Sequence, residues 1–342
     1  MTTATESLLG ESNAFLEIIE QASRLAPLRK PVLIIGERGT GKELIAHRLH
    51  YLSARWDQSF VTINCATLSE SLLETELFGH EAGSFTGAAK RHQGRFERAD
   101  GGTLFLDELA TTSARVQEKL LRVIEYGEFE RVGGAKPLKV DVRLVCATNE
   151  DLPALADKGL FRHDLLDRLA FDVITLPPLR ERREDILMLA EHFAHSMTRE
   201  LGYPLFAGFS RKATQLLLDY HWPGNVRELK NVVERSIYRQ GNPQLPLAEL
   251  VINPFDSPWR PQVTQPAQED RSEVQSASPL ALPLDLKQAV AEYEINLLKQ
   301  AMQQSQYNQR KAAQLLALSY HQFRGMLRKY QLLDGDNDAE QE

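Results

Sequence analysis

The sequence predicts an α/β domain with a parallel five-stranded sheet, a smaller all-helical subdomain and, further along the chain, a second all-helical domain. Between residue 7 and about residue 250, short β-rich runs alternate with helical patterns, and strands separated by helices are typical of a parallel sheet. The runs are apolar almost throughout, so we expect strands that are covered on both faces. The runs are Val32–Ile35, Phe60–Ile63, Thr103–Leu106, Val142–Val145 and Phe171–Ile174.

Helical spacing alone continues from about Pro178 to Arg239, which predicts the helical subdomain. Beyond it, six of the 16 prolines fall in residues 254–283 among Gln, Ser and Glu, a composition typical of an extended, mobile linker. A further helical pattern leads into an acidic tail, which we expect to be disordered. The predicted parts are an α/β core at 1–175, a helical subdomain at 176–250, a linker at 251–284, a helical domain at 285–331 and the tail at 332–342.

The formal net charge of -7 is an average over parts of opposite sign. Residues 285–331 carry seven basic and three acidic side chains, a net of +4, so contact with nucleic acid is expected there. Two cysteines, Cys65 and Cys146, are too few for a disulfide framework or a four-ligand zinc site. No apolar run approaches the length of a membrane span, and the first residues lack the pattern of a leader peptide. We therefore expect a cytoplasmic protein.

The first predicted strand leads into a glycine-rich loop and a helix. The loop has the G-x-x-x-x-G-K spacing of a P-loop, in which backbone N–H groups wrap around phosphates and the lysine supplies a charge. Its residues are Gly36, Glu37, Arg38, Gly39, Thr40, Gly41, Lys42 and Glu43. Glu43 stands where Ser or Thr normally ligates magnesium, so the ion must depend more on other groups and on water. The expected cofactors are ATP and Mg²⁺; the alternative is a glycine-rich turn that binds nothing.

Two acids, Asp107 and Glu108, follow the third predicted strand. Ligands of open α/β sheets bind beyond such strand ends. Asp107 is suited to hold the magnesium ion, and Glu108 is suited to orient and deprotonate an attacking water. An isolated Asp-Glu pair after a strand is more often a helix cap, but beside a P-loop it favours an ATPase.

Together with these motifs, residues 76–88 (ELFGHEAGSFTGA) resemble the AAA+ ATPases that activate sigma-54 RNA polymerase, also called bacterial enhancer-binding proteins. The P-loop of that family carries the same glutamate as Glu43, and its GAFTGA loop matches residues 83–88, with Ser84 in place of the usual Ala. The resemblance covers 7–240 and 286–330, and it implies a AAA+ fold whose helical subdomain is a lid. It also implies that the first loop contacts the sigma factor, through Gly83, Phe85, Thr86 and Gly87. By composition alone, this loop is an ordinary surface turn.

The resemblance implies roles in hydrolysis for residues outside these motifs. Asn64 matches the switch residue that restrains the catalytic glutamate, a strand-end cap being the alternative. Thr148 and Asn149 match the first sensor of nucleotide. Arg162 and Arg168 match arginine fingers that reach the nucleotide of a neighbouring subunit, surface salt bridges being the alternative. Fingers that act between subunits imply a ring, and the family forms hexamers.

Two further segments gain a role from the resemblance. Arg227 matches the second sensor, and it lies in the first turn of a predicted helix that Asn225 caps, with Glu228 at capping-box spacing. Residues 131–134 match a second loop that assists the first, and a plain hairpin turn is the alternative.

The helical domain at 285–331 is predicted as a long helix, a short helix capped by Asn308 and a last helix capped by Ser319, which fits a helix-turn-helix. Its predicted core is Ala312, Ala313, Leu316, Phe323 and Leu327. Base contacts are predicted for Tyr320, His321, Gln322 and Arg324, and phosphate contacts for Arg310, Lys311, Arg328 and Lys329. A bundle that only oligomerises is the alternative. Similarity to the C-terminal domain of the nucleoid protein Fis implies DNA binding as a dimer, with Tyr293, Leu297 and Leu298 on the dimer face.

We therefore predict a transcriptional activator that binds enhancer DNA and uses ATP hydrolysis to remodel closed complexes of sigma-54 RNA polymerase. The chain most resembles a member of the family that begins directly at the ATPase, and this resemblance implies that a membrane-stress protein holds it inactive in trans. A phage-shock, or membrane-stress, operon is the expected target. Trp56 is a candidate contact for such a repressor, unless it packs on the sheet edge. The alternative function is a AAA+ unfoldase or chaperone with an accessory DNA-binding domain; a helicase loader has no reason to carry the loop at 83–88.

Overall fold

The computed structural model describes residues 8–85, 88, 90–257, 259, 286–305, 307–330 and 332. Contacts within the chain divide it into two compact units, one on each side of residue 258, a position inside the predicted linker. Each unit is described here by itself. In the described parts of the chain, no helix is long and apolar enough to cross a membrane.

The first unit is built on a five-stranded sheet with the strand order β2-β3-β6-β1-β7. All the pairings are parallel, and the five strands are those that the sequence predicts. The register of β2 with β3 pairs Asn64 with Asp107, and that of β1 with β6 pairs Ile35 with Thr148. The strands are β1 (Val32–Ile35), β2 (Phe60–Asn64), β3 (Thr103–Asp107), β6 (Arg143–Thr148) and β7 (Val173–Thr175).

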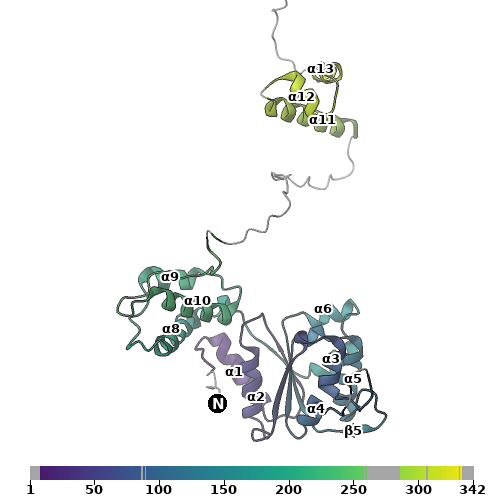
Figure 1. Ribbon diagram of the computed structural model, residues 1–342, viewed down its shortest axis with the longest axis vertical. Coiled ribbons are helices and arrows are strands. Elements are labelled where there is room, and N and C mark those ends of the chain that lie inside the picture. The colour runs from purple at the N-terminus through teal and green to yellow at the C-terminus, as the bar shows by residue number, and fades with distance from the viewer. Residues whose placement is uncertain are drawn as a thin grey trace, which may run out of the picture. The chain divides into compact units, whose positions relative to one another are not determined.

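Helices cover both faces of this sheet, as the continuous apolar strands predict (Figure 1). Successive side chains of a strand point to opposite faces, so Leu33 and Cys146 pack in one apolar core while Ile34 and Val145 pack in the other. The second core contains residues of α1 (Asn13–Leu25) and α2 (Lys42–Tyr51). The first core contains residues of α3 (Glu70–Phe78), α4 (Arg95–Arg98), α5 (Ala114–Tyr126), α6 (Leu152–Asp157) and α7 (His163–Leu169). Short 3-10 turns, η1 (Cys65–Thr67) and η2 (Leu109–Thr111), follow β2 and β3.

An antiparallel hairpin of β4 (Glu128–Glu130) and β5 (Pro137–Lys139) lies between α5 and β6. The sequence does not predict these strands, because they are three residues long and largely polar. Residues 131–134 form the connection of this hairpin, so the hairpin turn that was the alternative for this segment is present.

The helical subdomain follows the sheet as predicted, with η3 (Leu179–Glu181), α8 (Arg183–Glu200), α9 (Arg211–Asp219) and α10 (Asn225–Gln240). Its apolar core includes Trp222, which is fully buried and whose indole Nε1 donates to the carbonyl of Leu217 at 2.8 Å. A buried indole N–H needs such a partner, and this one fixes the turn before α10 to the end of α9.

The second unit contains α11 (Leu286–Gln304), α12 (Gln309–Leu315) and α13 (Tyr320–Lys329). Both predicted caps are present: Asn308 accepts from the backbone N–H groups of Arg310 and Lys311, and Ser319 forms a capping box with Gln322. The buried core is Leu298, Ala301, Ala312, Ala313, Phe323 and Leu327, with Leu316 half-buried beside it. Leu298 is 1% exposed, so its predicted place on a dimer face is wrong: the residue closes the core of its own unit.

Candidate active site

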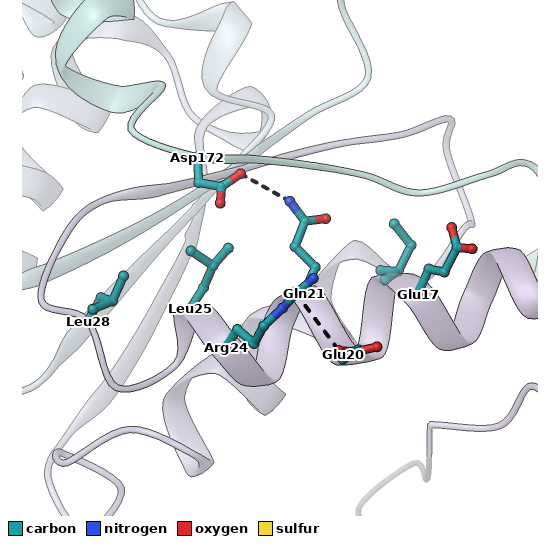
Figure 2. Close-up of a pocket in the computed structure, with 8 residues that line it drawn as sticks. Glu17, Glu20, Gln21, Arg24, Leu25, Leu28 and Asp172 are labelled. Carbon is teal, nitrogen blue, oxygen red and sulfur yellow. Dashed lines mark hydrogen bonds and ion pairs between the residues drawn. The ribbon is translucent and has the colours of Figure 1, made fainter.

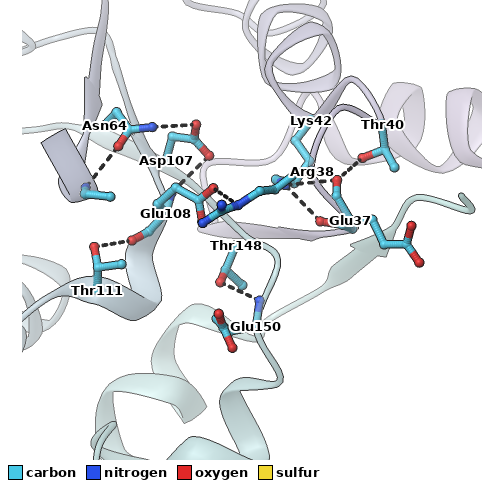
Figure 3. A network of polar contacts seen from close by, with 12 residues as sticks. Glu37, Arg38, Thr40, Lys42, Asn64, Asp107, Glu108, Thr111, Thr148 and Glu150 are labelled. Atoms are coloured by element: carbon cyan, nitrogen blue, oxygen red, sulfur yellow. Dashed lines mark hydrogen bonds and ion pairs between the residues drawn. The ribbon is translucent and has the colours of Figure 1, made fainter. Parts of the chain in front are cut away.

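The predicted nucleotide-binding residues gather at one edge of the sheet, where the parallel strands end. The P-loop follows β1, Asn64 ends β2, Asp107 ends β3 and Thr148 ends β6. Because these strands are neighbours in a parallel sheet, their carboxyl ends meet there. Figure 3 shows Asn64 and Asp107 facing one another at this edge, Arg38 of the P-loop reaching toward Glu108, and Thr148 bonded to the backbone of Glu150.

The P-loop is shaped by glycines in the left-handed region. Gly39 has φ 79° and Gly41 has φ 101°, and Gly41 directly precedes the first residue of α2. A Cβ added at Gly39 would lie 2.3 Å from the carbonyl oxygen of Gly224 in the lid. The loop therefore has room only for backbone at the point where it meets the lid.

Lys42 is held inside the loop. Its Nζ donates to the carbonyl of Gly36 at 2.8 Å and to that of Glu37 at 3.3 Å. Burial lowers the pKa of this ammonium, and the carboxylates of Asp107 and Glu108 oppose that effect. The lysine is thus a buried charge whose hydrogen-bond partners are neutral carbonyls. Its charge is therefore available to bind a phosphate.

The two acids have different partners. Asp107 accepts from Asn64 Nδ2 at 3.1 Å through one oxygen and from the backbone N–H of Glu108 at 3.0 Å through the other. The carboxylate of Glu108 instead lies 3.7 Å from the guanidinium of Arg38 in the P-loop. Glu108 precedes η2 without a side-chain capping bond, so the simple helix cap is not its role.

Asn64 makes the strand-end cap that was its alternative, since its Oδ1 accepts from the backbone N–H of Ala66 at 3.0 Å. Its amide nitrogen also donates to an acid. The resemblance implies Glu108 as that acid, but the partner in the structure is Asp107. The register of β2 and β3 is the physical reason: it places Asn64 beside Asp107, one residue before Glu108.

The first-sensor residues lie at the end of β6. The P-loop is joined to this strand by the backbone N–H of Gly36, which donates to Thr148 O at 3.2 Å. Thr148 Oγ1 accepts from the N–H of Glu150 at 3.0 Å. The amide oxygen of Asn149 is buried and has no hydrogen-bond partner within the described residues. An unpartnered amide oxygen at this strand end can accept a hydrogen bond from a water molecule.

The lid is fastened to the P-loop through Glu37. Its carboxylate accepts from Arg180 at 2.6 and 3.0 Å and from Asn225 Nδ2 at 3.0 Å. Hydrogen bonds from Arg180 and Asn225 lower the pKa of Glu37 to about 2. The side chain of Glu37 therefore faces the lid, and only its backbone carbonyl faces Lys42.

Sequence reasoning missed Arg180 and misassigned Asn225. The residue before α10 is Gly224, and Asn225 is the first residue of the helix, with φ 52°. Glu228 does reach back to the helix start, where its Oε2 accepts from Gly224 N at 2.8 Å. The expected capping residue is thus displaced by one position, because the side chain of Asn225 is used by the P-loop. Arg227 follows it, and a Cβ on Gly39 would lie 3.1 Å from Arg227 Cβ.

Three predicted residues have partners away from this centre. Glu43 Oε1 lies 4.0 Å from His47 Nε2 along α2. Arg162 pairs with Asp164 at 2.7 Å, and Arg168 pairs with Glu125 at 3.0 Å. The two arginines thus form the surface ion pairs that were their alternative, and such exposed pairs contribute little. Breaking these ion pairs, so that the arginines can contact a neighbouring subunit, would therefore cost little free energy.

The first loop is closed at its base by two backbone hydrogen bonds. His80 and His92 exchange backbone hydrogen bonds at 3.2 and 3.0 Å, which closes the base of the loop. Phe85 is 47% exposed and packs its ring edge-on against His80 at 5.0 Å. Gly83 N donates to the carbonyl of Ala88 at 2.8 Å, which brings the two sides of the loop together. Thr86 and Gly87 lie outside the described residues.

The hairpin connection at 131–134 packs against this loop. Val132 exchanges backbone bonds with the segment 79–81, accepting from Glu81 N and donating to Gly79 O. Arg131 is buried and donates to Glu81 at 2.6 Å and to Glu97 of α4. These bonds, chiefly the one to Glu97, raise the pKa of Arg131. The second segment therefore braces the first loop.

A separate surface hollow lies between α1 and the start of β7 (Figure 2). It is lined by Glu17, Glu20, Gln21, Arg24 and Asp172, among others, and Gln21 Nε2 donates to Asp172 at 3.0 Å. It contains none of the residues that the sequence predicts for a site.

In the second unit, the predicted base-contacting residues His321 and Arg324 are exposed at the start of α13, and Tyr320 is half-buried under the guanidinium of Arg310, 5.9 Å from its ring. Gln322 uses its side chain for the capping box with Ser319. Lys311 and Arg328 are exposed, whereas Lys329 lies 3.6 Å from Glu294 of α11.

These residues fit the phosphates of a nucleoside triphosphate: the glycine loop leads directly into α2, and the buried ammonium of Lys42 lies within the loop. Within the described residues, no group of three or more His, Cys, Asp or Glu gathers to hold a metal ion. A divalent ion would therefore need ligands from phosphate and water besides Asp107, which is how proteins commonly hold Mg²⁺.

Comparisons with known proteins agree with this geometry. The Sigma-54 interaction domain family matches residues 8–175, and the AAA+ ATPase lid domain family matches residues 180–254. The Psp operon transcriptional activator of Escherichia coli (strain K12) is 61% identical over 332 residues, which are 97% of this chain and 100% of that protein. The regulatory protein AtoC of the same organism is 41% identical over 94% of this chain and 67% of its own length. The crystal structure of NtrX from Brucella abortus in complex with ATP has a TM-score of 0.66 at 32% identity, covering 95% of this chain and 69% of that chain.

Proposed function

This chain belongs to the sigma-54 activators, AAA+ ATPases with a Sigma-54 interaction domain, and we propose that it activates a phage-shock operon by remodelling closed promoter complexes. As a member, it binds and hydrolyses ATP and acts on RNA polymerase that carries sigma-54. The observation that carries the proposal is that one α/β domain holds both a nucleotide site and a braced loop with an exposed Phe85.

The residues at the sheet edge divide the work of hydrolysis. The P-loop backbone and Lys42 hold the phosphates, and Asp107 holds Mg²⁺, which neutralises developing phosphate charge when it is bound. Glu108 orients water and accepts its proton, since it is the one acid of the pair that no amide holds. Thr148, Asn149 and Arg227 border the phosphates from β6 and the lid.

The active form is a ring, a hexamer, in which Arg162 and Arg168 of one subunit complete the site of the next. Both guanidinium groups are exposed and held only by surface acids in the single chain, which supports this role. The ring presents the first loops, at Gly83, Phe85, Thr86 and Gly87, to the sigma factor.

The protein acts in the cytoplasm, and its second unit is a helix-turn-helix that binds enhancer DNA. Its three short-looped helices, with exposed His321 and Arg324 at the start of α13, suit a recognition helix in the major groove. Tyr320 and Gln322 have partners of their own and would have to give them up in part to touch bases. Arg310, Lys311, Arg328 and Lys329 contact phosphates. Because Leu298 is in the core, the dimer face is left to Tyr293, which is 67% exposed, and to Leu297.

A negative regulator of the phage-shock system acts on this chain in trans. Trp56 is 63% exposed, which favours a contact role over packing on the sheet edge, and Tyr51 and Leu52, a few residues earlier in the chain, are exposed as well. An exposed aromatic group of this kind suits a protein contact. If a Trp56→Ala variant is repressed as strongly as the wild type, Trp56 is not part of the contact with the negative regulator.

The test is ATP-dependent open-complex formation with sigma-54 RNA polymerase. The wild type is compared with Thr86→Ala and with a chain truncated at about residue 260. We expect Thr86→Ala to lose activation while it retains ATP hydrolysis, and the truncated chain to lose dependence on enhancer DNA. If neither change alters promoter-specific activation while hydrolysis persists, a protein unfoldase becomes the better assignment.

A further inference from the structure

One buried side chain joins three segments around the P-loop. Asn225 is fully buried, and its Oδ1 accepts from the backbone N–H of Leu179 at 2.8 Å, at the start of the lid. Its Nδ2 donates to the carboxylate of Glu37 at 3.0 Å and to the carbonyl of Arg38 at 3.1 Å. The start of η3, the P-loop and the first turn of α10 therefore meet on a single amide.

The backbone around Asn225 indicates that this position is constrained. Asn225 and Trp222 both have positive φ values, 52° and 49°. Non-glycine residues keep such values only where their surroundings hold them, and asparagine tolerates them better than most. Val226 adds a backbone bond, since its N–H donates to the carbonyl of Gly39 at 3.0 Å. Two consecutive residues at the start of α10, Asn225 and Val226, thus form hydrogen bonds with the P-loop.

Glu37 is the P-loop side of this arrangement. It accepts two bonds from Arg180 besides the bond from Asn225, so one carboxylate joins η3 to the first residue of α10. Figure 3 shows its carboxylate pointing away from Asp107 and Glu108. Its P-loop position therefore does not make it a phosphate ligand.

We propose that Asn225, Glu37 and Arg180 form a latch that sets the lid on the P-loop and thereby positions Arg227 for ATP hydrolysis. Arg227 is two residues beyond Asn225 on α10, and a Cβ on Gly39 would lie 3.1 Å from Arg227 Cβ. The position of Arg227 therefore depends on how the start of α10 packs on the P-loop. The three latch residues do not touch the nucleotide in this role; they act through Arg227. The proposal rests on the ATPase function stated above.

The first test is Asn225→Asp. The change is isosteric and retains the acceptor for Leu179, but it removes both donated bonds and sets a second carboxylate against Glu37. Hydrogen bonds to charged groups are worth enough to expect kcat for ATP hydrolysis to fall about tenfold or more. Nucleotide binding, measured with a fluorescent ADP analogue, should stay within about threefold, because Lys42 and the loop backbone hold the phosphates.

The second test is rescue. Adding Glu37→Gln to Asn225→Asp removes the repulsion and supplies an amide donor to the new carboxylate, so kcat should recover to about that of Glu37→Gln alone. Asn242→Asp is the matched control, because Asn242 is exposed on the same subdomain, and its side chain only accepts a bond from Gln244 N. We expect wild-type kcat from it.

The outcomes separate the latch from the ATPase assignment. A wild type that does not hydrolyse ATP, or a Glu108→Gln variant that does, would count against the assigned site. With an active wild type, the latch is overturned if Asn225→Asp has wild-type kcat, or if its loss is not relieved by Glu37→Gln. If Asn225→Asp does not fold, Glu37→Gln alone decides, because it alters a half-exposed residue and should lower kcat without changing nucleotide binding.

Discussion

The hydroxyl of Ser84 is buried where the first loop meets the hairpin. Its Oγ has no hydrogen-bond partner among the residues that the structure describes. A Cβ added at Gly133 would lie 2.4 Å from Ser84 Cβ, so the two segments pack here without spare room. A buried hydroxyl without a partner is destabilising. The serine therefore weakens the packing of the first loop against its brace.

We predict that Ser84→Ala raises the free energy of unfolding by about 1 kcal/mol, because it removes an unsatisfied buried hydroxyl and leaves the packed Cβ in place. Thermal unfolding of the isolated protein measures this. Ser69→Ala is the control: Ser69 is exposed and makes no side-chain capping bond, so no change is expected. A lower melting temperature for Ser84→Ala would show that the hydroxyl is satisfied in solution.

Glu108 is another residue whose conformation has a cost. It has φ 52° directly after a buried strand, and a non-glycine residue in this region costs on the order of 1 to 3 kcal/mol. Such strain persists where the surrounding structure holds it, and here β3 and η2 do so. The conformation turns the carboxylate toward the P-loop, where Arg38 lies 3.7 Å away.

Among the elements, the first loop and the β4–β5 hairpin act as one unit through Arg131. Burial works to raise the pKa of Glu97, but the hydrogen bonds and charge of Arg131 outweigh it, so the pKa is lowered. Arg131 is 7% exposed and bonds to acids on both sides, at Glu81 in the loop and at Glu97 on α4. The loop is thus anchored to the same helix that follows it.

We predict that Arg131→Ala lowers the free energy of unfolding by about 3 kcal/mol and reduces open-complex formation at least tenfold, with ATP hydrolysis changed much less. Removing one partner of a buried ion pair leaves the other charge without compensation. Arg91→Ala is the control, because Arg91 approaches the same Glu97 at 3.5 Å from an exposed position. Loss of hydrolysis in parallel with activation would contradict a brace that serves the loop alone.

The lid and the P-loop are the second pair of joined elements, and their junction depends on pH in a defined direction. The pKa of Glu37 is lowered from 4.5 to about 2, so its contribution to stability is present above about pH 4.5 and is lost as the pH falls toward 2. We predict that the difference in free energy of unfolding between wild type and Glu37→Gln is constant from pH 5 to 8 and shrinks below pH 4.5. Denaturant unfolding at several pH values measures it, and a difference that grows in acid would contradict the ion pair.

At the scale of the whole molecule, the proposed ring implies that the nucleotide site of a single chain is incomplete. The P-loop, the acids and the lid are assembled at one sheet edge, whereas Arg162 and Arg168 have partners around α7. The proposed ring supplies the missing arginines from the neighbouring subunit. ATP hydrolysis should therefore rise more than linearly with protein concentration.

We predict that Arg168→Ala binds ATP but hydrolyses it about 10³-fold more slowly or worse, the usual effect of losing an arginine finger. Mixing this variant with Lys42→Ala should restore part of the hydrolysis, because Lys42→Ala subunits lend Arg168 to intact sites. Arg199→Ala, an exposed arginine of the lid, is the control and should be fully active. No recovery at any mixing ratio would mean that Arg168 does not act between subunits.

The sequence by itself determined the five parallel strands, the helical subdomain, the three helices of the second unit and the residues of the P-loop and of its acids. These features depend on local apolar periodicity, on caps and on motifs whose members are neighbours in the chain. The ends of strands follow from the same patterns, which is why Asn64, Asp107 and Thr148 could be placed at one edge.

Only the tertiary structure decided which polar groups are partners. Asn225 and Glu37 are 188 residues apart, and Arg180 and Glu37 are 143 apart, so no local pattern could pair them. The same holds for Arg131 with Glu81 and Glu97, and for Leu298, whose place in a core or on a surface depends on the packing of α12 and α13. Long-range hydrogen bonds depend on the final register of strands and helices, and that register exists only once the chain has folded.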